Sequence, residues 1–288
     1  MVKNYLKSIR FVNLILLFLL FWGLLFQIKS KPFFLTINLN TFLLSISIIL
    51  TTASGYLINN FFDFNSDAIN GKNQFYFSKS HYLISYIIHV ILSFFFIFIS
   101  DLSGAWIQLV FYCHMLVLFY SVFLQHIPLI GNLAVAILCG IVVYIPHILL
   151  VGFQWNNNFN LQDSNSELLV IFSMLFTLAR ELIKDVEDLQ GDQKTNSNTI
   201  AVAFGVKTSK TLIISVFLIS FLILIYSCFL TPITVNSLCF FIPTLVITGI
   251  LILNSIKSNS KIAFNKLSKL VKIQFLIATV WLYFEVIT

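Results

Sequence analysis

The sequence predicts an all-α membrane protein, a multi-span bundle of about nine transmembrane helices in one chain. Hydrophobic residues make up 59% of the chain and charged residues only 10%, whereas a soluble domain carries roughly 25% charged residues. The apolar residues form stretches long enough to cross a bilayer as helices, which takes about 20 residues. Strict alternation of polar and apolar residues, which is typical of membrane barrels, is absent. Backbone groups in lipid must therefore be satisfied within helices.

Nine apolar segments follow one another along the chain. The first is long, has no clear small-residue cleavage site and is followed by further spans, so we expect a membrane helix rather than a cleaved signal peptide. The Asn-rich stretch 155–167 before the sixth segment predicts a solvated loop. The nine segments are 11–28, 37–58, 82–100, 104–124, 129–152, 166–182, 209–230, 233–254 and 267–287.

The distribution of Lys and Arg predicts the orientation of the bundle. Cytoplasmic loops of membrane proteins carry an excess of these residues. With nine spans and a cytoplasmic N-terminus, 15 of the 17 cations fall on the cytoplasmic side, and only Lys29 and Lys31 fall on the other. We therefore expect a multi-pass protein of the cell inner (cytoplasmic) membrane. The cytoplasmic cations are Lys3, Lys7, Arg10, Lys72, Lys79, Arg180, Lys184, Lys194, Lys207, Lys210, Lys257, Lys261, Lys266, Lys269 and Lys272.

The remaining composition argues for one membrane-embedded domain over residues 1–288, because no long Pro-, Gly- or Ser-rich linker divides the chain. The net charge of +6 is spread over loops next to the spans, so it does not indicate nucleic-acid binding. The four cysteines lie singly in apolar segments and are expected to be small buried residues. The five histidines form no two-histidine metal spacing, and no P-loop or GxGxxG motif is present.

Acidic residues gather in two polar stretches, which hold seven of the eleven carboxylates. The first stretch contains Asn59, Asp63 and Asp67, spaced by four residues, so one helical face would present all three. The second contains Glu181, followed by a set at positions i, i+3 and i+7 that also shares one face: Asp185, Asp188 and Asp192. Both stretches lie on the cytoplasmic side, after the second and sixth spans.

Two carboxylate faces at one membrane rim repel each other unless a cation lies between them. Hard oxygen ligands favour Mg2+, which typically binds one or two carboxylates together with substrate phosphates. The sequence therefore predicts a carboxylate–Mg2+–diphosphate site above an apolar bundle that holds a lipid tail. The expected metal ligands are Asn59, Asp63, Asp67, Asp185, Asp188 and Asp192.

These two runs resemble the two aspartate motifs of the UbiA superfamily of intramembrane prenyltransferases. Asn59, Asp63 and Asp67 match the family's NDxxDxxxD motif, and the run DVEDLQGD matches its DxxxD-type motif. The stretch PLIGNLAVAILCG at 128–140 resembles the opening of the family's fifth helix, and the helix count agrees. The run ARELIKDVEDLQGD is most similar to the branch that includes the digeranylgeranylglyceryl phosphate synthases.

The resemblance implies an Mg2+-dependent prenyltransferase that acts on a prenyl diphosphate, for which we expect the geranylgeranyl ester, and on a membrane-soluble acceptor. Its reaction would rest on four carboxylates: Asp63, Asp67, Asp185 and Asp188. Cations near the motifs would hold the diphosphate, and aromatic faces would stabilise an allylic cation. The family also has polar residues facing the cavity at the start of its first helix. The expected substrate-binding residues are Arg10, Asn13, Lys72, Tyr120, Arg180, Lys184 and Lys194.

Some positions depart from the family pattern. Asn60 stands where the family usually has Asp, and Gln125 and Asn198 stand where relatives often have Lys.

The resemblance leaves several functions open. As acceptor of the prenyl group, a geranylgeranylglyceryl phosphate-type lipid is expected first, and an aromatic quinone precursor is the alternative. A non-catalytic membrane protein or a transporter of the same helical class is the second alternative.

Overall fold

The computed structural model describes residues 2–29, 38–70, 77–151, 165–195, 197–230 and 235–287. All regular elements within these ranges are helices. They are α1 (Val2–Ser8), α2 (Phe11–Lys29), α4 (Leu39–Phe62), α5 (Phe64–Ile69), α6 (Lys79–Ile99), α7 (Gly104–Val122), the 3-10 turn η1 (Leu124–His126), α8 (Ile130–Val151), α9 (Asn165–Lys194), α10 (Ile200–Leu230), α11 (Val235–Lys257) and α12 (Lys261–Ile287).

Nine of the described helices have 19 or more residues, and each corresponds to one predicted apolar segment. Six described helices are long and apolar enough to cross a membrane, or seven if the pair α1 and α2, bent by 60°, is one span. The other two long helices, α9 and α12, carry more charge. The all-α, multi-pass architecture is thus confirmed.

Helix α9 is longer than the predicted segment at both ends. It begins at Asn165, and Glu167 in its first turn is buried, so the predicted solvated loop was wrong for residues 165–167. Residues 152–164 of that loop lie outside the described residues. At the other end α9 continues to Lys194. A helix of 30 residues is about 45 Å long, so it exceeds a hydrocarbon core of about 30 Å.

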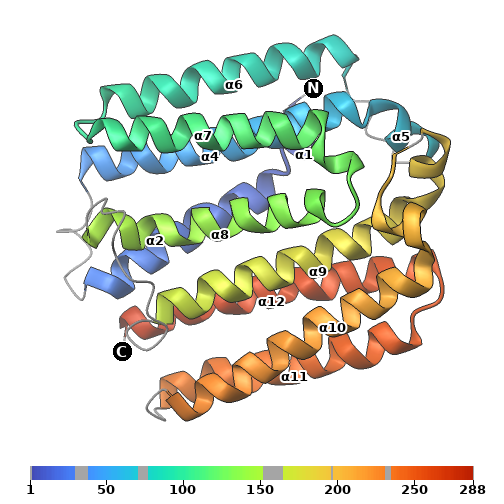
Figure 1. The fold of residues 1–288 in the computed structure, drawn as a ribbon. Coiled ribbons are helices and arrows are strands. Elements are labelled where there is room, and N and C mark those ends of the chain that lie inside the picture. The colour runs from blue at the N-terminus through green and yellow to red at the C-terminus, as the bar shows by residue number, and fades with distance from the viewer. Residues whose placement is uncertain are drawn as a thin grey trace.

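The long helices form a closed arrangement in which neighbours contact one another in the order α2, α4, α7, α8, α9 and α12. Helix α6 packs outside α4 and α7, while α10 and α11 pack outside α9 and α12 (Figure 1). The short helix α5 extends α4 and contacts α9 at one end of the bundle. This contact joins two segments that are more than a hundred residues apart in the sequence.

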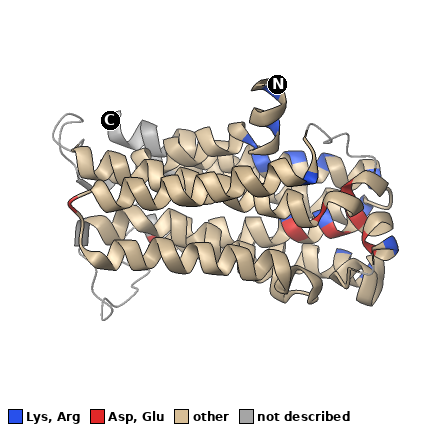
Figure 2. Ribbon diagram, turned by 90° about the horizontal axis from the view of Figure 1, so that it is seen from above, with Lys and Arg blue, Asp and Glu red and all other residues tan. Residues whose placement is uncertain are grey.

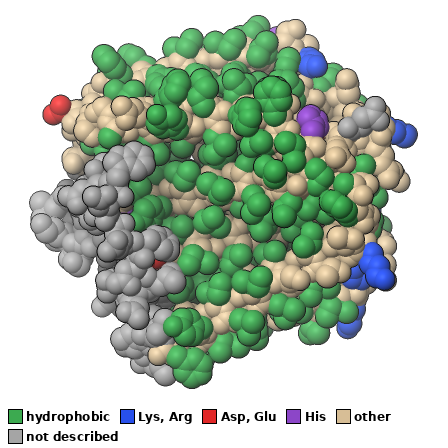
Figure 3. Space-filling model, in the orientation of Figure 1, with side chains coloured by type: hydrophobic (Ala, Val, Ile, Leu, Met, Phe, Trp, Pro, Cys, Tyr) green, Lys and Arg blue, Asp and Glu red, His purple; other side chains and the backbone are tan. Residues whose placement is uncertain are grey.

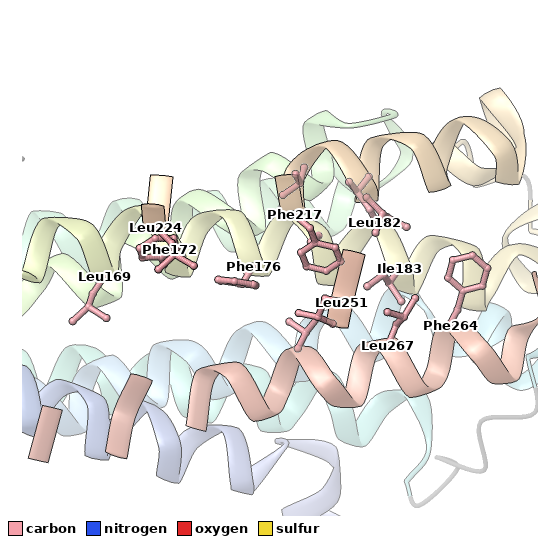
Figure 4. Close-up of a cluster of buried hydrophobic side chains, with 14 of the residues drawn as sticks. Leu169, Phe172, Phe176, Leu182, Ile183, Phe217, Leu224, Leu251, Phe264 and Leu267 are labelled. Carbon is pink, nitrogen blue, oxygen red and sulfur yellow. The ribbon is translucent and has the colours of Figure 1, made fainter. Parts of the chain in front are cut away.

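Buried apolar side chains fill the space between these helices. In the largest cluster, Phe172 and Phe176 of α9 pack with Phe217 of α10, Leu251 of α11 and Leu267 of α12 (Figure 4). The outer surface is also apolar: hydrophobic side chains cover most of the described face in Figure 3. Such a surface is costly in water but suits contact with lipid.

Hydrogen bonds also join the helices of the N-terminal half. Ser47 of α4 donates to the carbonyl oxygen of Ser93 of α6 at 2.9 Å. The buried His114 of α7 lies 2.6 Å from the Ser93 hydroxyl and 3.3 Å from that of Thr51. Polar contacts of this kind hold transmembrane helices together where no hydrophobic effect drives their association.

Charged residues gather at the end of the bundle that contains α5, as Figure 2 shows. The acidic residues of the two predicted motifs lie there with many of the Lys and Arg residues. The body of the bundle between its two ends is nearly free of charge in the described part of the chain. This distribution places the predicted site at one membrane rim.

Candidate active site

The first acidic motif lies at the junction of α4 and α5. The two helices are separated by Asp63, so Asn59, Asp63 and Asp67 do not lie on one continuous helix, contrary to the prediction. The backbone N–H of Asp63 still donates to Asn59 at 2.8 Å, and that of Asp67 donates to Asp63 at 2.9 Å. The spacing by one turn is therefore retained, and both aspartates line one pocket.

The Asn59 side chain orients Asp63. Its Nδ2 donates to Asp63 Oδ2 at 2.6 Å, and the residue is buried. Asn59 does not itself line the pocket among the described residues. The role of Asn59 as a metal ligand stays a prediction.

The second motif lies entirely on α9. The carboxylates of Glu181, Asp185, Asp188 and Asp192 all line the same pocket as those of the first motif. Their spacing of four, three and four residues places them along one face of the helix. The structure thus brings the two predicted acidic faces to a shared cavity.

Helix α5 is held on α9 by a close backbone approach. Asn70 donates to the carbonyl oxygen of Asp188 at 3.2 Å and accepts from the backbone N–H of Gly191 at 2.9 Å. Ser66 donates to Asp192 Oδ1 at 3.1 Å. A Cβ atom at Gly191 would overlap the Asn70 side chain and lie 2.7 Å from the Ser66 carbonyl oxygen, so glycine permits this contact.

The third side of the pocket comes from the connection between α7 and α8. Asn132 in α8 donates to Asp185 Oδ2 at 3.0 Å. Gly131 lies so close to this connection that a Cβ atom would be 2.7 Å from the Leu124 carbonyl oxygen. Leu129 has a φ of 68°, which costs energy for a bulky residue and requires support from its surroundings. Two further side chains complete this side, namely Tyr120 and Gln125.

Burial and mutual repulsion disturb the ionisation of the acids in the part of α9 beyond the predicted span. Burial raises the pKa of Asp185 to about 7, although the hydrogen bond from Asn132 acts in the opposite direction. Burial and the charge of Asp188 raise the pKa of Asp192 to about 6, with a further contribution from Asp63. Acids from both motifs therefore act on one another across the pocket.

The pocket suits Mg2+ bound together with a phosphate ligand. Its potential metal donors are carboxylate, amide and hydroxyl oxygens, which Mg2+ prefers. Among the described residues, no three His, Cys, Asp or Glu side chains converge closely enough to hold a metal ion by themselves. This agrees with a cation that takes only one or two carboxylates and completes its shell with substrate phosphates and water.

Five of the seven predicted substrate-binding residues fall into three groups. Lys184 and Tyr120 line the pocket. Arg180 donates to Glu181 at 2.7 Å, and Lys194 is exposed at the end of α9; neither lines the pocket among the described residues. Lys72 lies outside the described residues.

The other two predicted residues, Arg10 and Asn13, meet at Tyr56 of α4. The guanidinium of Arg10 lies 4.6 Å from the centre of the Tyr56 ring. The Asn13 amide lies 3.5 Å from the Tyr56 hydroxyl. None of these three residues lines the acidic pocket.

Sequence reasoning missed several polar residues that support the acids, namely Ser66, Asn70, Asn132 and Thr199. Asn132 lies in the stretch 128–140 that resembled the family, and its polar side chain in an apolar segment was the available signal. Asn60 donates to the carbonyl oxygen of Ser8 at 3.0 Å, so in this chain it holds α1 rather than lining the pocket.

A model of the UbiA prenyltransferase family matches residues 16–277. The chain belongs to this family. The resemblance noted from the two aspartate motifs is thus confirmed. This UbiA chain is a prenyltransferase, and its fold and motifs agree with that membership.

Individual UbiA relatives include digeranylgeranylglyceryl phosphate synthases. That of Methanosphaera stadtmanae is 30% identical over 260 residues, which cover 85% of this chain and 87% of the relative. That of Methanobrevibacter smithii is 28% identical, with 84% of this chain and 86% of the relative covered.

Solved structures agree in fold. A structure from work on digeranylgeranylglyceryl phosphate synthase in membranes superposes with a TM-score of 0.67 at 21% identity, covering 99% of this chain and 98% of that chain. A UbiA homologue from Archaeoglobus fulgidus bound to GPP and Mg2+ superposes with a TM-score of 0.66 at 15% identity, covering 97% and 99%.

Proposed function

We propose that this prenyltransferase transfers a geranylgeranyl group from its diphosphate to a hydroxyl of a geranylgeranylglyceryl phosphate-type acceptor, with Mg2+ as cofactor. The observation that carries the proposal is the single pocket lined by carboxylates from both motifs: Asp63 and Asp67 at the α4–α5 junction, and Asp185, Asp188 and Asp192 on α9. The named relatives in Methanosphaera and Methanobrevibacter support the choice of acceptor.

The geometry supports a division of labour among the chain's own residues. The carboxylates of the two acidic faces would hold Mg2+ at the diphosphate end of the donor, and Lys184 offers that diphosphate a positive charge. Mg2+, when bound, supplies positive charge that offsets the negative charge developing on the leaving diphosphate. The bond between the first prenyl carbon and the diphosphate oxygen breaks, and the acceptor oxygen forms a new bond to that carbon. The hydroxyl proton is released.

Two features of the surroundings assist this chemistry. Tyr120 presents an aromatic ring in the pocket wall, and such a ring stabilises a nearby cation that is shielded from water. The apolar helices below the polar end exclude water, which would otherwise capture the allylic cation.

We also propose that the polar end faces the cytoplasm and that the protein resides in the cell inner (cytoplasmic) membrane.

The proposal is tested by following diphosphate release from geranylgeranyl diphosphate by purified protein, with Mg2+ or with EDTA. The acceptors are geranylgeranylglyceryl phosphate, 4-hydroxybenzoate and dihydroxynaphthoate. We expect release with Mg2+ and the glyceryl phosphate acceptor, and a loss of about 100-fold or more in Asp63→Ala. Asp101→Ala is the matched control, because Asp101 is exposed in the connection between α6 and α7.

Release with only the aromatic acceptors would replace the proposed acceptor by a quinone precursor. Failure of the wild-type chain to bind the diphosphate in the presence of Mg2+ would exclude the reaction altogether.

A further inference from the structure

The last third of the chain is cationic. Between residues 193 and 284 the sequence has eight lysines and no Asp or Glu. Four of these lysines lie on α12, namely Lys261, Lys266, Lys269 and Lys272. The positive-inside rule accounts for lysines in the loops that join membrane helices. It does not require lysines along the side of a helix beyond its first turn, so the set on α12 has a further cause.

Helix α12 has a buried side and an exposed side. Its contacts with α2, α9 and α11 bury a row of apolar side chains that runs from Phe264 to Val271. Lys266, Lys269 and Lys272 are exposed. Their spacing of three residues keeps them together on the side that faces away from the buried row. We call these three lysines the lysine face of α12.

An apolar stripe continues the lysine face along the helix. Ile273, Leu276 and Val280 follow Lys269 at positions i+4, i+7 and i+11, which share one helical face. Their side chains are 45%, 46% and 48% exposed. In a bilayer such side chains contact lipid chains, which are as apolar as they are. Cations followed by aliphatic side chains on one exposed face match the order of headgroup and acyl chain in a lipid.

The lysine face lies at the edge of the hydrocarbon core. Helix α12 has 27 residues and is about 40 Å long, whereas the hydrocarbon core is about 30 Å thick. Lys266 is five residues and Lys272 eleven residues from the start of the helix, which is about 8 and 16 Å along its axis. Long Lys side chains extend from such positions toward the headgroups. Cations at this depth are costly unless an anion accompanies them.

The protein itself supplies little compensating charge. Glu187 of α9 attracts Lys272, whereas Arg180, Arg10 and Lys269 repel it. No ion pair joins a residue of the lysine face to a carboxylate in the described part of the chain. One acid therefore stands against three lysines, and an external anion would offset the positive charge that remains.

We propose that the lysine face binds an anionic phospholipid of the surrounding bilayer. The phosphate of its headgroup contacts Lys266, Lys269 and Lys272, and one acyl chain lies along the apolar stripe. The site is on the outer surface of the bundle, and none of the three lysines lines the acidic pocket. It is therefore independent of the proposed function. A lipid held here would fix the depth of α12, which packs against the motif-bearing helix α9.

The test measures binding of single lipids to the purified, delipidated full chain in non-ionic detergent by native mass spectrometry. The probes are phosphatidylglycerol and phosphatidylcholine with identical chains, and glycerol phosphate. We expect the wild type to bind phosphatidylglycerol more tightly than phosphatidylcholine. The triple variant Lys266→Gln, Lys269→Gln, Lys272→Gln should lose at least about tenfold in affinity for phosphatidylglycerol, because charge-assisted contacts are removed. Its affinity for phosphatidylcholine should be unchanged.

Two matched variants control for net charge and folding. The variant Lys3→Gln, Lys207→Gln, Lys257→Gln removes three exposed cations that lie outside α12, and it should keep the wild-type preference for phosphatidylglycerol. The variant Lys266→Arg, Lys269→Arg, Lys272→Arg keeps the charge of the lysine face and should also keep the preference.

Three results would overturn the inference. The first is an equal loss of phosphatidylglycerol affinity in the two glutamine variants, which would attribute the preference to net charge. The second is an unchanged preference in the variant of the lysine face. The third is competition by glycerol phosphate as strong as that by phosphatidylglycerol, which would indicate a site for a free anion. Because the assay contains no prenyl substrate, its outcome does not depend on whether the chain transfers a prenyl group.

Discussion

At the residue scale, Asp185 shows how neighbours set the ionisation of a carboxyl group. Burial raises its pKa to about 7, and the amide of Asn132, 3.0 Å from Asp185 Oδ2, favours the charged form. Asn132→Ala removes this donor, so the pKa rises further. We expect the rate of diphosphate release at pH 7 to fall about 10- to 100-fold and the acid limb of the pH profile to move to higher pH.

Measurement of release between pH 6 and 9 checks this prediction, with Asn254→Ala of α11 as the control. A lower rate with an unchanged pH profile would show that Asn132 acts on packing rather than on Asp185.

The same acids determine how stability depends on pH without Mg2+. Asp185 and Asp192 have pKa values of about 7 and about 6 in the folded chain, above the usual value of about 3.9 in an unfolded chain. Between about pH 4 and 7 the folded state therefore binds more protons, and stability falls as pH rises. We expect the melting temperature in EDTA to fall over this range, and to fall less in Asp185→Asn. If the melting temperature falls equally with pH in the wild type and in Asp185→Asn, this account is refuted.

At the scale of elements, the contact of α5 with α9 brings the two motifs together. Gly191 allows this approach because a side chain there would overlap Asn70 and Ser66. Gly191→Ala should therefore displace α5 and reduce activity at least about tenfold, while the circular dichroism of the helices remains unchanged. A Cβ atom at Gly249 of α11 would meet no neighbouring helix or side chain within 4 Å, so Gly249→Ala should retain full activity and gain helix stability. Equal activity of the two variants would contradict the role of this contact.

At the scale of the whole molecule, the cations and acids concentrate at one end of an apolar bundle. The positive-inside rule predicts that this end faces the cytoplasm. In a cysteine-free background, a membrane-impermeant maleimide added to intact cells should label Asp101→Cys, between α6 and α7, but not Ser78→Cys, at the start of α6. Both positions are exposed. Labelling of Ser78→Cys but not of Asp101→Cys would show that the bundle has the opposite orientation in the membrane.

The sequence by itself determined the fold class and the two acidic motifs. Nine apolar segments must form helices, because no other open structure satisfies the backbone in lipid. The spacings of 59–63–67 and 185–188–192 also place their side chains one turn apart without any tertiary contact. These features depend only on local chemistry, so they were predictable.

Only the tertiary structure decided which residues meet. The contact of Asn132 with Asp185 and the approach of Gly191 to Asn70 join helices that are distant in the sequence. The length of α9 beyond the membrane also escaped prediction, because its last turns are polar and resemble a loop until α5 and α8 pack against them. Side-chain spacing is a property of one helix, whereas these contacts depend on how several helices pack.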